Sequence, residues 1–126
     1  KRKKFAKMYN ELFSENDKIN PLAVNYDMVV PHIYVVLINS QCDREKIRKY
    51  LLEKGIQTGV HYQPNHLLSA FFCNHNNHLP TTELIYPKLL SLPLHPDLHE
   101  ENIGYVAKFL IECTKDNFFD NLNGFN

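Results

Sequence analysis

Two stretches of the chain carry apolar residues every three or four positions, the spacing of a helix with one buried face. In residues 1–15 the repeat consists of Phe5, Met8, Tyr9, Leu12 and Phe13. In the last helix, which we expect to end near Lys115, it consists of Ile103, Val106, Ala107 and Leu110. A further helix is predicted between a cap at Ser40 or Asp43 and a stop at Gly55, with Ile47, Tyr50 and Leu51 on one face.

Other stretches have the patterns of strands. Residues 32–38 are apolar on both alternating faces, which predicts a central strand covered from two sides. In residues 56–62, the alternation of side chains along a strand assigns every second residue to the core and the residues between them to the opposite face. The core set is Ile56, Thr58, Val60 and Tyr62, and the opposite set is Gln57, Gly59 and His61. A brief strand is predicted at residues 91–95, where Pro93 favours a sheet edge.

The remaining segments are polar or irregular. Residues 14–26 are interpreted as a linker, and residues 64–80, rich in His and Asn, as a functional or mobile loop. Thr81 or Thr82 can cap a short helix that runs to about Leu90, and residues 116–126 are interpreted as a frayed polar tail. The order of elements predicts an α+β fold, a small mainly antiparallel sheet with helices packed on one face.

Length and composition are those of one ordinary soluble domain. The chain has 126 residues, 44% of them hydrophobic, and its 14 basic side chains balance 14 acidic ones. This composition favours neither nucleic acid nor a membrane as a partner. Cys42, Cys73 and Cys113 are odd in number and widely spaced, which favours reduced thiols and a cytoplasmic location. Because the chain starts at Lys1, we also expect its true beginning to be missing.

Few residues are candidates for catalysis. The four glycines are too scattered to cradle a phosphate, and no nucleophile motif is present. The pair His75 and His78 has no thiolate or carboxylate at ligand spacing, so we interpret both as surface histidines and predict no metal site. The lysines of the predicted helices lie on solvent faces, which does not suit a Schiff-base nitrogen. We therefore predict no catalytic and no cofactor-binding residue within the chain.

The segment 61–66 (HYQPNH) stands out, because two histidines and a tyrosine occur where a strand leaves the sheet. Together with His32-Ile-Tyr, Arg44, Gly55-Ile-Gln-Thr, Leu79-Pro-Thr-Thr-Glu and Leu90-Ser-Leu-Pro-Leu-His95, it resembles the end of the DegT/DnrJ/StrS sugar aminotransferases. The resemblance covers about residues 1–113. Asn65 and His99 depart from the family pattern, which commonly has an apolar residue and a Ser or Thr cap at these places.

The resemblance implies the C-terminal small domain of a fold-type I enzyme that uses pyridoxal phosphate (PLP). Residues 1–15 then form a connector helix from a large domain, which lies outside the chain and covers the apolar stripe of this helix. Residues 16–115 form the small domain, and residues 116–126 form the tail. The large domain supplies PLP and its lysine, so the fragment alone is inactive and binds no cofactor. His61, Tyr62, Pro64 and His66 are implied to face the substrate.

The implied reaction transfers an amino group, usually from glutamate, to a keto sugar attached to a nucleotide, for a surface polysaccharide or an antibiotic. The implied partners are the large domain, a second subunit of a homodimer, the nucleotide sugar and the amino donor. Two alternatives stay open at this point. One is a non-catalytic regulatory or ligand-binding module with the same fold, and the other is a stand-alone ligand-binding α+β domain.

Overall fold

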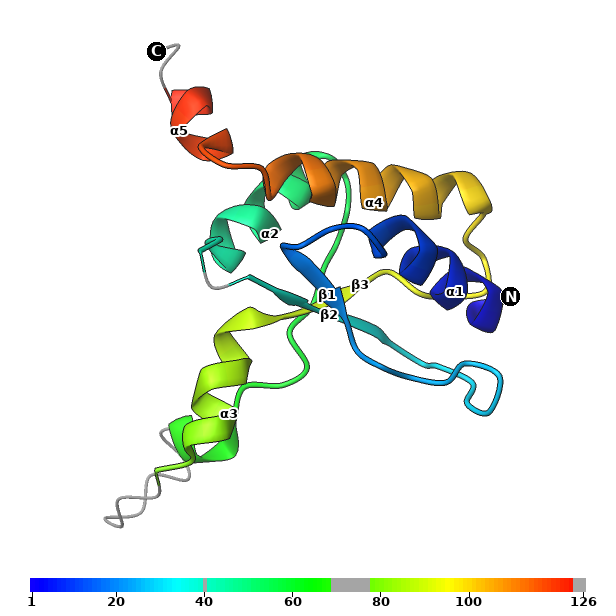
Figure 1. Cartoon of the computed structure of the whole chain (residues 1–126), viewed down its shortest axis with the longest axis horizontal. Coiled ribbons are helices and arrows are strands. Elements are labelled where there is room, and N and C mark those ends of the chain that lie inside the picture. Colours follow the sequence, from blue (N-terminus) through cyan, green and yellow to red (C-terminus); the bar gives the residue numbers. More distant parts are fainter. Residues whose placement is uncertain (40, 69–77, 124–126) are drawn as a thin grey trace.

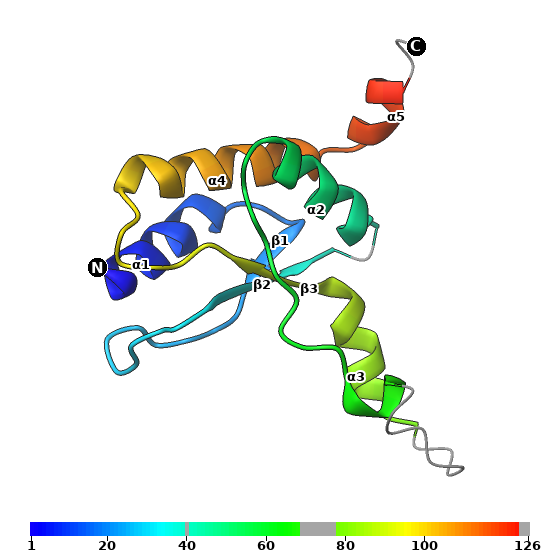
Figure 2. The same cartoon turned by 180° about the vertical axis from the view of Figure 1, so that it is seen from behind.

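The fold is a small antiparallel sheet with a layer of helices on one face. The computed structural model describes residues 1–39, 41–68 and 78–123. In this part of the chain, β2 (Tyr34–Ile38) lies between β1 (Ile19–Pro21) and β3 (Leu89–Leu92), and both pairings are antiparallel. Figures 1 and 2 show from opposite sides that α1 (Arg2–Phe13), α2 (Arg44–Glu53) and α4 (Glu100–Cys113) lie on the same side of the sheet. The predicted fold class is confirmed.

Several short elements lie outside this layer. The 3₁₀ helix η1 (Asn65–Leu67), helix α3 (Pro80–Ile85) and the 3₁₀ helix η3 (Tyr86–Lys88) project from the sheet away from α1, α2 and α4 (Figure 1). No residue of these three elements is buried. We call residues 63–68 and 78–88 the arm. Packing into the hydrophobic core therefore contributes little to its position.

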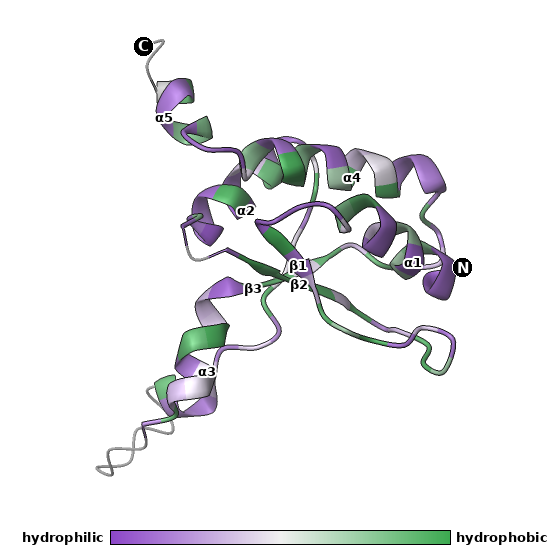
Figure 3. Cartoon of the chain, in the orientation of Figure 1, coloured by the Kyte–Doolittle hydropathy of each residue, from purple (hydrophilic) through white to green (hydrophobic). Residues whose placement is uncertain are grey.

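The core lies between the helices and the sheet. Figure 3 shows hydrophobic segments along the strands and an alternation of hydrophobic and hydrophilic segments along α1 and α4. In α4, the predicted stripe is buried throughout, at Ile103, Val106, Ala107 and Leu110. Two phenols of the core have acceptors, since Tyr9 donates to the Pro93 carbonyl at 3.1 Å and Tyr34 to Asn10 Oδ1 at 2.7 Å. The core thus buries these tyrosines without leaving their hydroxyls unpaired.

Helix α1 belongs to this core, which corrects one prediction. Phe5, Tyr9 and Phe13 are at most 3% exposed, because α1 packs against α4 and β1. The prediction that a large domain outside the chain covers the stripe is therefore wrong for these three residues. Only Leu12, 44% exposed, leaves a large apolar surface uncovered on this helix.

Helix α2 has the predicted ends. The Asp43 carboxylate accepts hydrogen bonds from the backbone N–H groups of Glu45 and Lys46 at 3.0 and 3.1 Å, so Asp43 is the cap. Gly55 follows the helix with a φ of +75°, a conformation that glycine adopts without the penalty of a side chain. Ile47 and Leu51 are buried as predicted, and Tyr50 is half-buried.

The strands agree with the sequence pattern only in part. In β2, Tyr34, Val36 and Ile38 are buried, whereas Val35 and Leu37 on the opposite face are only half-buried. Residues 14–26 are not only a linker, because Ile19–Pro21 forms the edge strand β1. Residues 56–62 do not form the predicted regular strand, since a single bridge pairs Gly59 with Ser91.

Two helix predictions also need correction. Helix α3 begins at Pro80 with Leu79 as its N-cap, so neither Thr81 nor Thr82 caps it. Residues 116–126 are not a frayed tail throughout, because Phe118–Asn123 forms helix α5. The rings of Phe118 and Phe119 pack edge-on against Tyr50, at centroid distances of 5.0 and 6.3 Å. These aromatic contacts account for order in a segment whose composition is polar.

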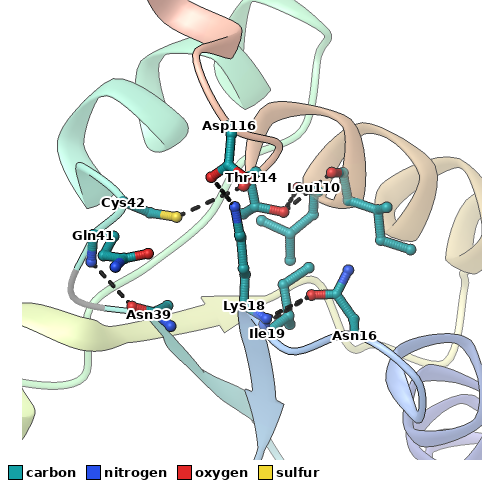
Figure 4. A network of polar contacts seen from close by, with 10 residues as sticks. Asn16, Lys18, Ile19, Asn39, Gln41, Cys42, Leu110, Thr114 and Asp116 are labelled. Carbon is teal, nitrogen blue, oxygen red and sulfur yellow. Dashed lines mark hydrogen bonds and ion pairs between the residues drawn. The ribbon is translucent and has the colours of Figure 1, made fainter.

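A network of polar contacts joins β1 to the end of α4 (Figure 4). Lys18 forms an ion pair with Asp116, which follows α4 in the chain. Asn16 Oδ1 accepts from the backbone N–H groups of Lys18 and Ile19 at 2.9 and 3.0 Å. Cys42 Sγ lies 3.8 Å from the Thr114 carbonyl, across the same network. The start of the sheet and the end of the helical layer are thereby tied together.

Candidate functional site

The candidate site lies along the outer edge of β3. Gly59 and Ser91 exchange two backbone hydrogen bonds, of 3.0 and 2.8 Å, so the chain around Gly59 follows this edge. His61 Nδ1 then lies 2.9 Å from the hydroxyl of Ser91, whose side chain is buried. The hydrogen bond fixes the imidazole ring on the sheet and leaves Nε2 as the nitrogen that can bind a ligand.

Gly59 allows this arrangement, because a Cβ at position 59 would lie 2.5 Å from His61 Cε1. The sequence predicts that this glycine leaves space for a close approach, and the group that approaches is the ring of His61 itself. His61 points away from the core, as predicted. Tyr62 does not belong to the core, which corrects its assignment by alternation, because it is 79% exposed.

The structure brings together two of the four predicted site residues. The rings of His61 and Tyr62 are in edge-to-face contact, with centroids 4.9 Å apart. Pro64 is half-buried and precedes η1, which contains Asn65 and His66. His66 instead lies beside α3, with Nε2 3.1 Å from Glu83 Oε1. The site therefore consists of an exposed aromatic pair and a separate imidazole held by a carboxylate.

Two residues of this site received no role from the sequence. Ser91 orients His61, and Glu83 binds His66, although both stand in segments that carry the family resemblance. The backbone N–H of Leu79 and, to a smaller extent, the imidazole of His66 hold the pKa of Glu83 below its usual range. Glu83 is thus a carboxylate near neutral pH. The only signal for these two roles in the sequence is that Ser91 and Glu83 belong to motifs that resemble those of the aminotransferase family.

The sequence predicts no metal site at His75 and His78, and the structure describes only one of these two residues. His75 and Cys73 lie outside the described residues. His78 Nδ1 contacts Glu83 Oε2 at 2.8 Å. Within residues 1–39, 41–68 and 78–123, no group of three His, Cys, Asp or Glu side chains has the arrangement of a metal site.

The most buried of the ion-paired lysines does not have the environment of an aldimine lysine. An aldimine lysine needs a desolvated amine whose pKa is lowered. The most buried ion-paired lysine, Lys18, has the opposite environment, because its hydrogen bond to Asp116 raises its pKa. Cys113 is no better as a nucleophile, since burial raises the pKa of its thiol to about 12. No covalent step is therefore assigned to these side chains.

None of the described helices is long and apolar enough to cross a membrane.

Known proteins resemble this chain over most of its length. A pleiotropic regulatory protein of Geobacillus stearothermophilus is 32% identical over 117 residues, which are 88% of this chain and 31% of that protein. The dTDP-3-amino-3,6-dideoxy-alpha-D-galactopyranose transaminase of Aneurinibacillus thermoaerophilus is 32% identical over 78 residues, or 61% of this chain and 21% of the enzyme. The chain thus spans a third or less of these relatives.

A solved structure shows the same fold. The PLP form of Spr1654 from Streptococcus pneumoniae, assigned as a sugar aminotransferase, superimposes with a TM-score of 0.81 at 25% identity. The alignment covers 90% of this chain and 30% of that protein. Residues 1–111 match the model of the DegT/DnrJ/EryC1/StrS aminotransferase family. Because this match includes nearly the whole described core and the candidate site, the chain belongs to the DegT/DnrJ/EryC1/StrS aminotransferase family.

Proposed function

We propose that this chain is the C-terminal small domain of a PLP-dependent aminotransferase that transfers an amino group from glutamate to a nucleotide-linked keto sugar. The family match supports the reaction class, and the name of the relative from Aneurinibacillus supports a nucleotide sugar. The observation in the structure that carries the proposal is the exposed pair of His61 and Tyr62, held at a sheet edge by the buried Ser91. Side chains that are exposed to solvent and yet fixed in their orientation suit ligand binding.

In this proposal the chain binds and orients the substrate. His61 donates or accepts a hydrogen bond through Nε2, and Tyr62 offers a flat apolar ring and a hydroxyl to the sugar or the base. Pro64 and His66 also contact the substrate in this proposal. PLP supplies the electron sink of the reaction.

In this proposal the cofactor and its lysine belong to a large domain outside this chain, as the resemblance to the family implies. The large domain precedes α1, and a homodimer partner completes the enzyme, which works in the cytoplasm. The chain alone then lacks transaminase activity. Leu12 is the residue of α1 whose exposed apolar surface faces a neighbour in this arrangement.

Borohydride reduction in the presence of PLP tests the proposal on the full-length protein and on the chain of residues 1–126 in parallel. Peptide mass spectrometry then locates any phosphopyridoxyl lysine. We expect one stoichiometric adduct in the full-length protein, outside the 126 residues, and only scattered traces on the chain alone. A single stoichiometric lysine within residues 1–126 would contradict the proposed location of the cofactor.

A second candidate function is a regulatory module without catalysis. It is favoured by the 32% identity over 117 residues to a protein named as a pleiotropic regulator. The same experiment separates the two functions. A full-length protein that forms no specific adduct, and no amino sugar from a nucleotide-linked keto sugar and glutamate, would favour the regulatory module.

A further inference from the structure

Glu83 joins two segments that are separated in the chain. Its Oε1 lies 3.1 Å from His66 Nε2 and accepts the backbone N–H of Leu79 at 3.0 Å. Its Oε2 lies 2.8 Å from His78 Nδ1. His66 and His78 are far apart in the sequence, so one carboxylate joins two described stretches of the chain.

The contacts differ in their burial and therefore in their strength. The side chain of His66 is 11% exposed and that of Glu83 31%, whereas that of His78 is 72% exposed. A hydrogen bond to an ionised group is stronger where water is largely excluded, and an exposed ion pair contributes little. The contact between Glu83 and His66 is therefore the main link, and the one with His78 is secondary.

The arm depends on this link because it lacks a core of its own. No residue of η1 or α3 is buried, and Leu67 and Leu84 are 42% and 64% exposed. Figure 2 shows the arm projecting from the sheet on the side opposite to α4. Without the carboxylate, the backbone turn of η1 is held by two local hydrogen bonds, from Leu67 to Pro64 and from Leu68 to Asn65.

We propose that Glu83 is a positioning residue for substrate binding, which holds His66 and η1 in place in the segment that follows His61 and Tyr62 in the chain. The inference rests on the proposed function, because it gives η1 a role only if residues 61–66 bind the nucleotide sugar. Glu83 itself acts through His66. Among the described residues, its carboxylate contacts His66, His78 and Leu79, all within the arm.

Amide hydrogen exchange on the chain of residues 1–126 tests the link without cofactor or substrate. Glu83→Ala removes all three contacts, and we expect the amides of Leu67 and Leu68 to exchange about tenfold faster, the effect of losing a charged hydrogen bond. Glu83→Gln keeps an oxygen that can accept from Leu79 and His66 but lacks the charge, so its amides should exchange more slowly than those of Glu83→Ala and faster than those of the unaltered chain. Unchanged exchange in Glu83→Ala would overturn the proposal.

Two control variants separate the link from general effects on stability. Glu11→Ala changes an exposed carboxylate of α1, far from the arm, and should leave the exchange of the η1 amides unaltered. His78→Ala removes the exposed contact and keeps the one with His66, so we expect a change of less than about twofold. An equal acceleration in Glu83→Ala and His78→Ala would contradict the assignment of His66 as the main link.

Steady-state kinetics of the full-length enzyme test the role in substrate binding. Glu83→Ala should raise the KM for the nucleotide sugar about five- to tenfold with a smaller effect on kcat, since a mispositioned binding segment weakens binding before chemistry. Glu83→Gln should stay within about twofold of the unaltered enzyme. Faster exchange with an unchanged KM would overturn the positioning role. Absence of a PLP adduct in the unaltered protein would remove the proposed function, and this role with it.

Discussion

At the scale of single residues, Gly59 sets the geometry of the candidate site. Gly59→Ala places a Cβ 2.5 Å from His61 Cε1, so the imidazole must move and its hydrogen bond to Ser91 is lost. The buried hydroxyl of Ser91 then lacks this partner. We expect the free energy of unfolding to fall by about 1–2 kcal/mol, as measured by urea denaturation.

Gly104 provides the matched control within the same chain. It lies in α4, and a Cβ there meets no atom within 4 Å. Gly104→Ala should therefore raise the free energy of unfolding by about 0.5–1 kcal/mol, because alanine loses less backbone entropy in a helix than glycine. If both substitutions changed the stability in the same direction, the contact between position 59 and His61 would not be the cause.

The sequence predicts the space at Gly59 but not what fills it. Strand alternation identifies the face of Gly59 and His61, and it says nothing about a ring that folds back on its own chain. Alternation also assigns Tyr62 to the core, and this assignment is wrong because regular pairing is confined to the bridge at Gly59. Whether His61, Tyr62, Pro64 and His66 bind substrate stays a prediction.

At the scale of elements, Arg44 attaches the arm to the helical layer. Its Nη1 donates to the Tyr86 carbonyl at 2.6 Å and to the Leu89 carbonyl at 3.3 Å, and its guanidinium lies 5.0 Å from the centre of the Tyr86 ring. A lysine cannot reproduce the planar group that makes these contacts together. Arg44→Lys should lower the free energy of unfolding by about 1–2 kcal/mol in urea denaturation.

Arg48→Lys is the control for this prediction. Arg48 lies one turn further along α2, is 36% exposed, and binds Glu45 through Nη1 at 2.9 Å. Exposed pairs of this kind contribute little, so we expect a change within about 0.5 kcal/mol. Equal losses in the two variants would mean that the exchange of arginine for lysine in α2 as such, and not the contacts with η3 and β3, determines the effect.

The elements that the sequence predicts well are those with local signals. Helices α2 and α4 have the apolar period of a helix, and α2 also has a capping Asp43 and a terminal Gly55. Strand β1 has three residues and ends at Pro21, so it is too short for a period to be seen. Helix α5 forms where Phe118 and Phe119 meet Tyr50, a tertiary contact that no local pattern reveals.

At the scale of the whole molecule, the core and the candidate site lie apart. Helices α1, α2 and α4 cover one face of the sheet (Figure 1), whereas Gly59 pairs with the outer edge of β3 and His61 lies beside Ser91 there. An amphipathic stripe shows that a helix is covered but not by which partner, and the cover that the family resemblance implies for α1 lies outside the chain. Its burial against α4 makes residues 2–13 part of this fold.

The core also contains ionisable groups that are held neutral. Burial raises the pKa of the Cys113 thiol to about 12 and the pKa of the Tyr9 and Tyr34 hydroxyls above their usual range. In the unfolded chain these groups release protons near their ordinary values, about 8.5 for cysteine and about 10 for tyrosine. The folded chain therefore binds more protons at alkaline pH. The stability that this burial provides is complete below about pH 8.5 and is lost as the pH rises toward the folded values.

We expect the free energy of unfolding in urea to be nearly constant between about pH 7 and 8.5 and to fall steeply above about pH 10. Each group that ionises only in the unfolded chain contributes about 1.4 kcal/mol per pH unit to this slope. Tyr34→Phe removes one such group, so the fall of its unfolding free energy with pH above pH 10 should be less steep by about that amount. At neutral pH this variant should be less stable than the unaltered chain, because it lacks the hydrogen bond to Asn10. Tyr105→Phe, at a residue 46% exposed, should keep the slope of the unaltered chain. Equal slopes in all three proteins would show that ionisation of the buried tyrosine does not drive the alkaline transition.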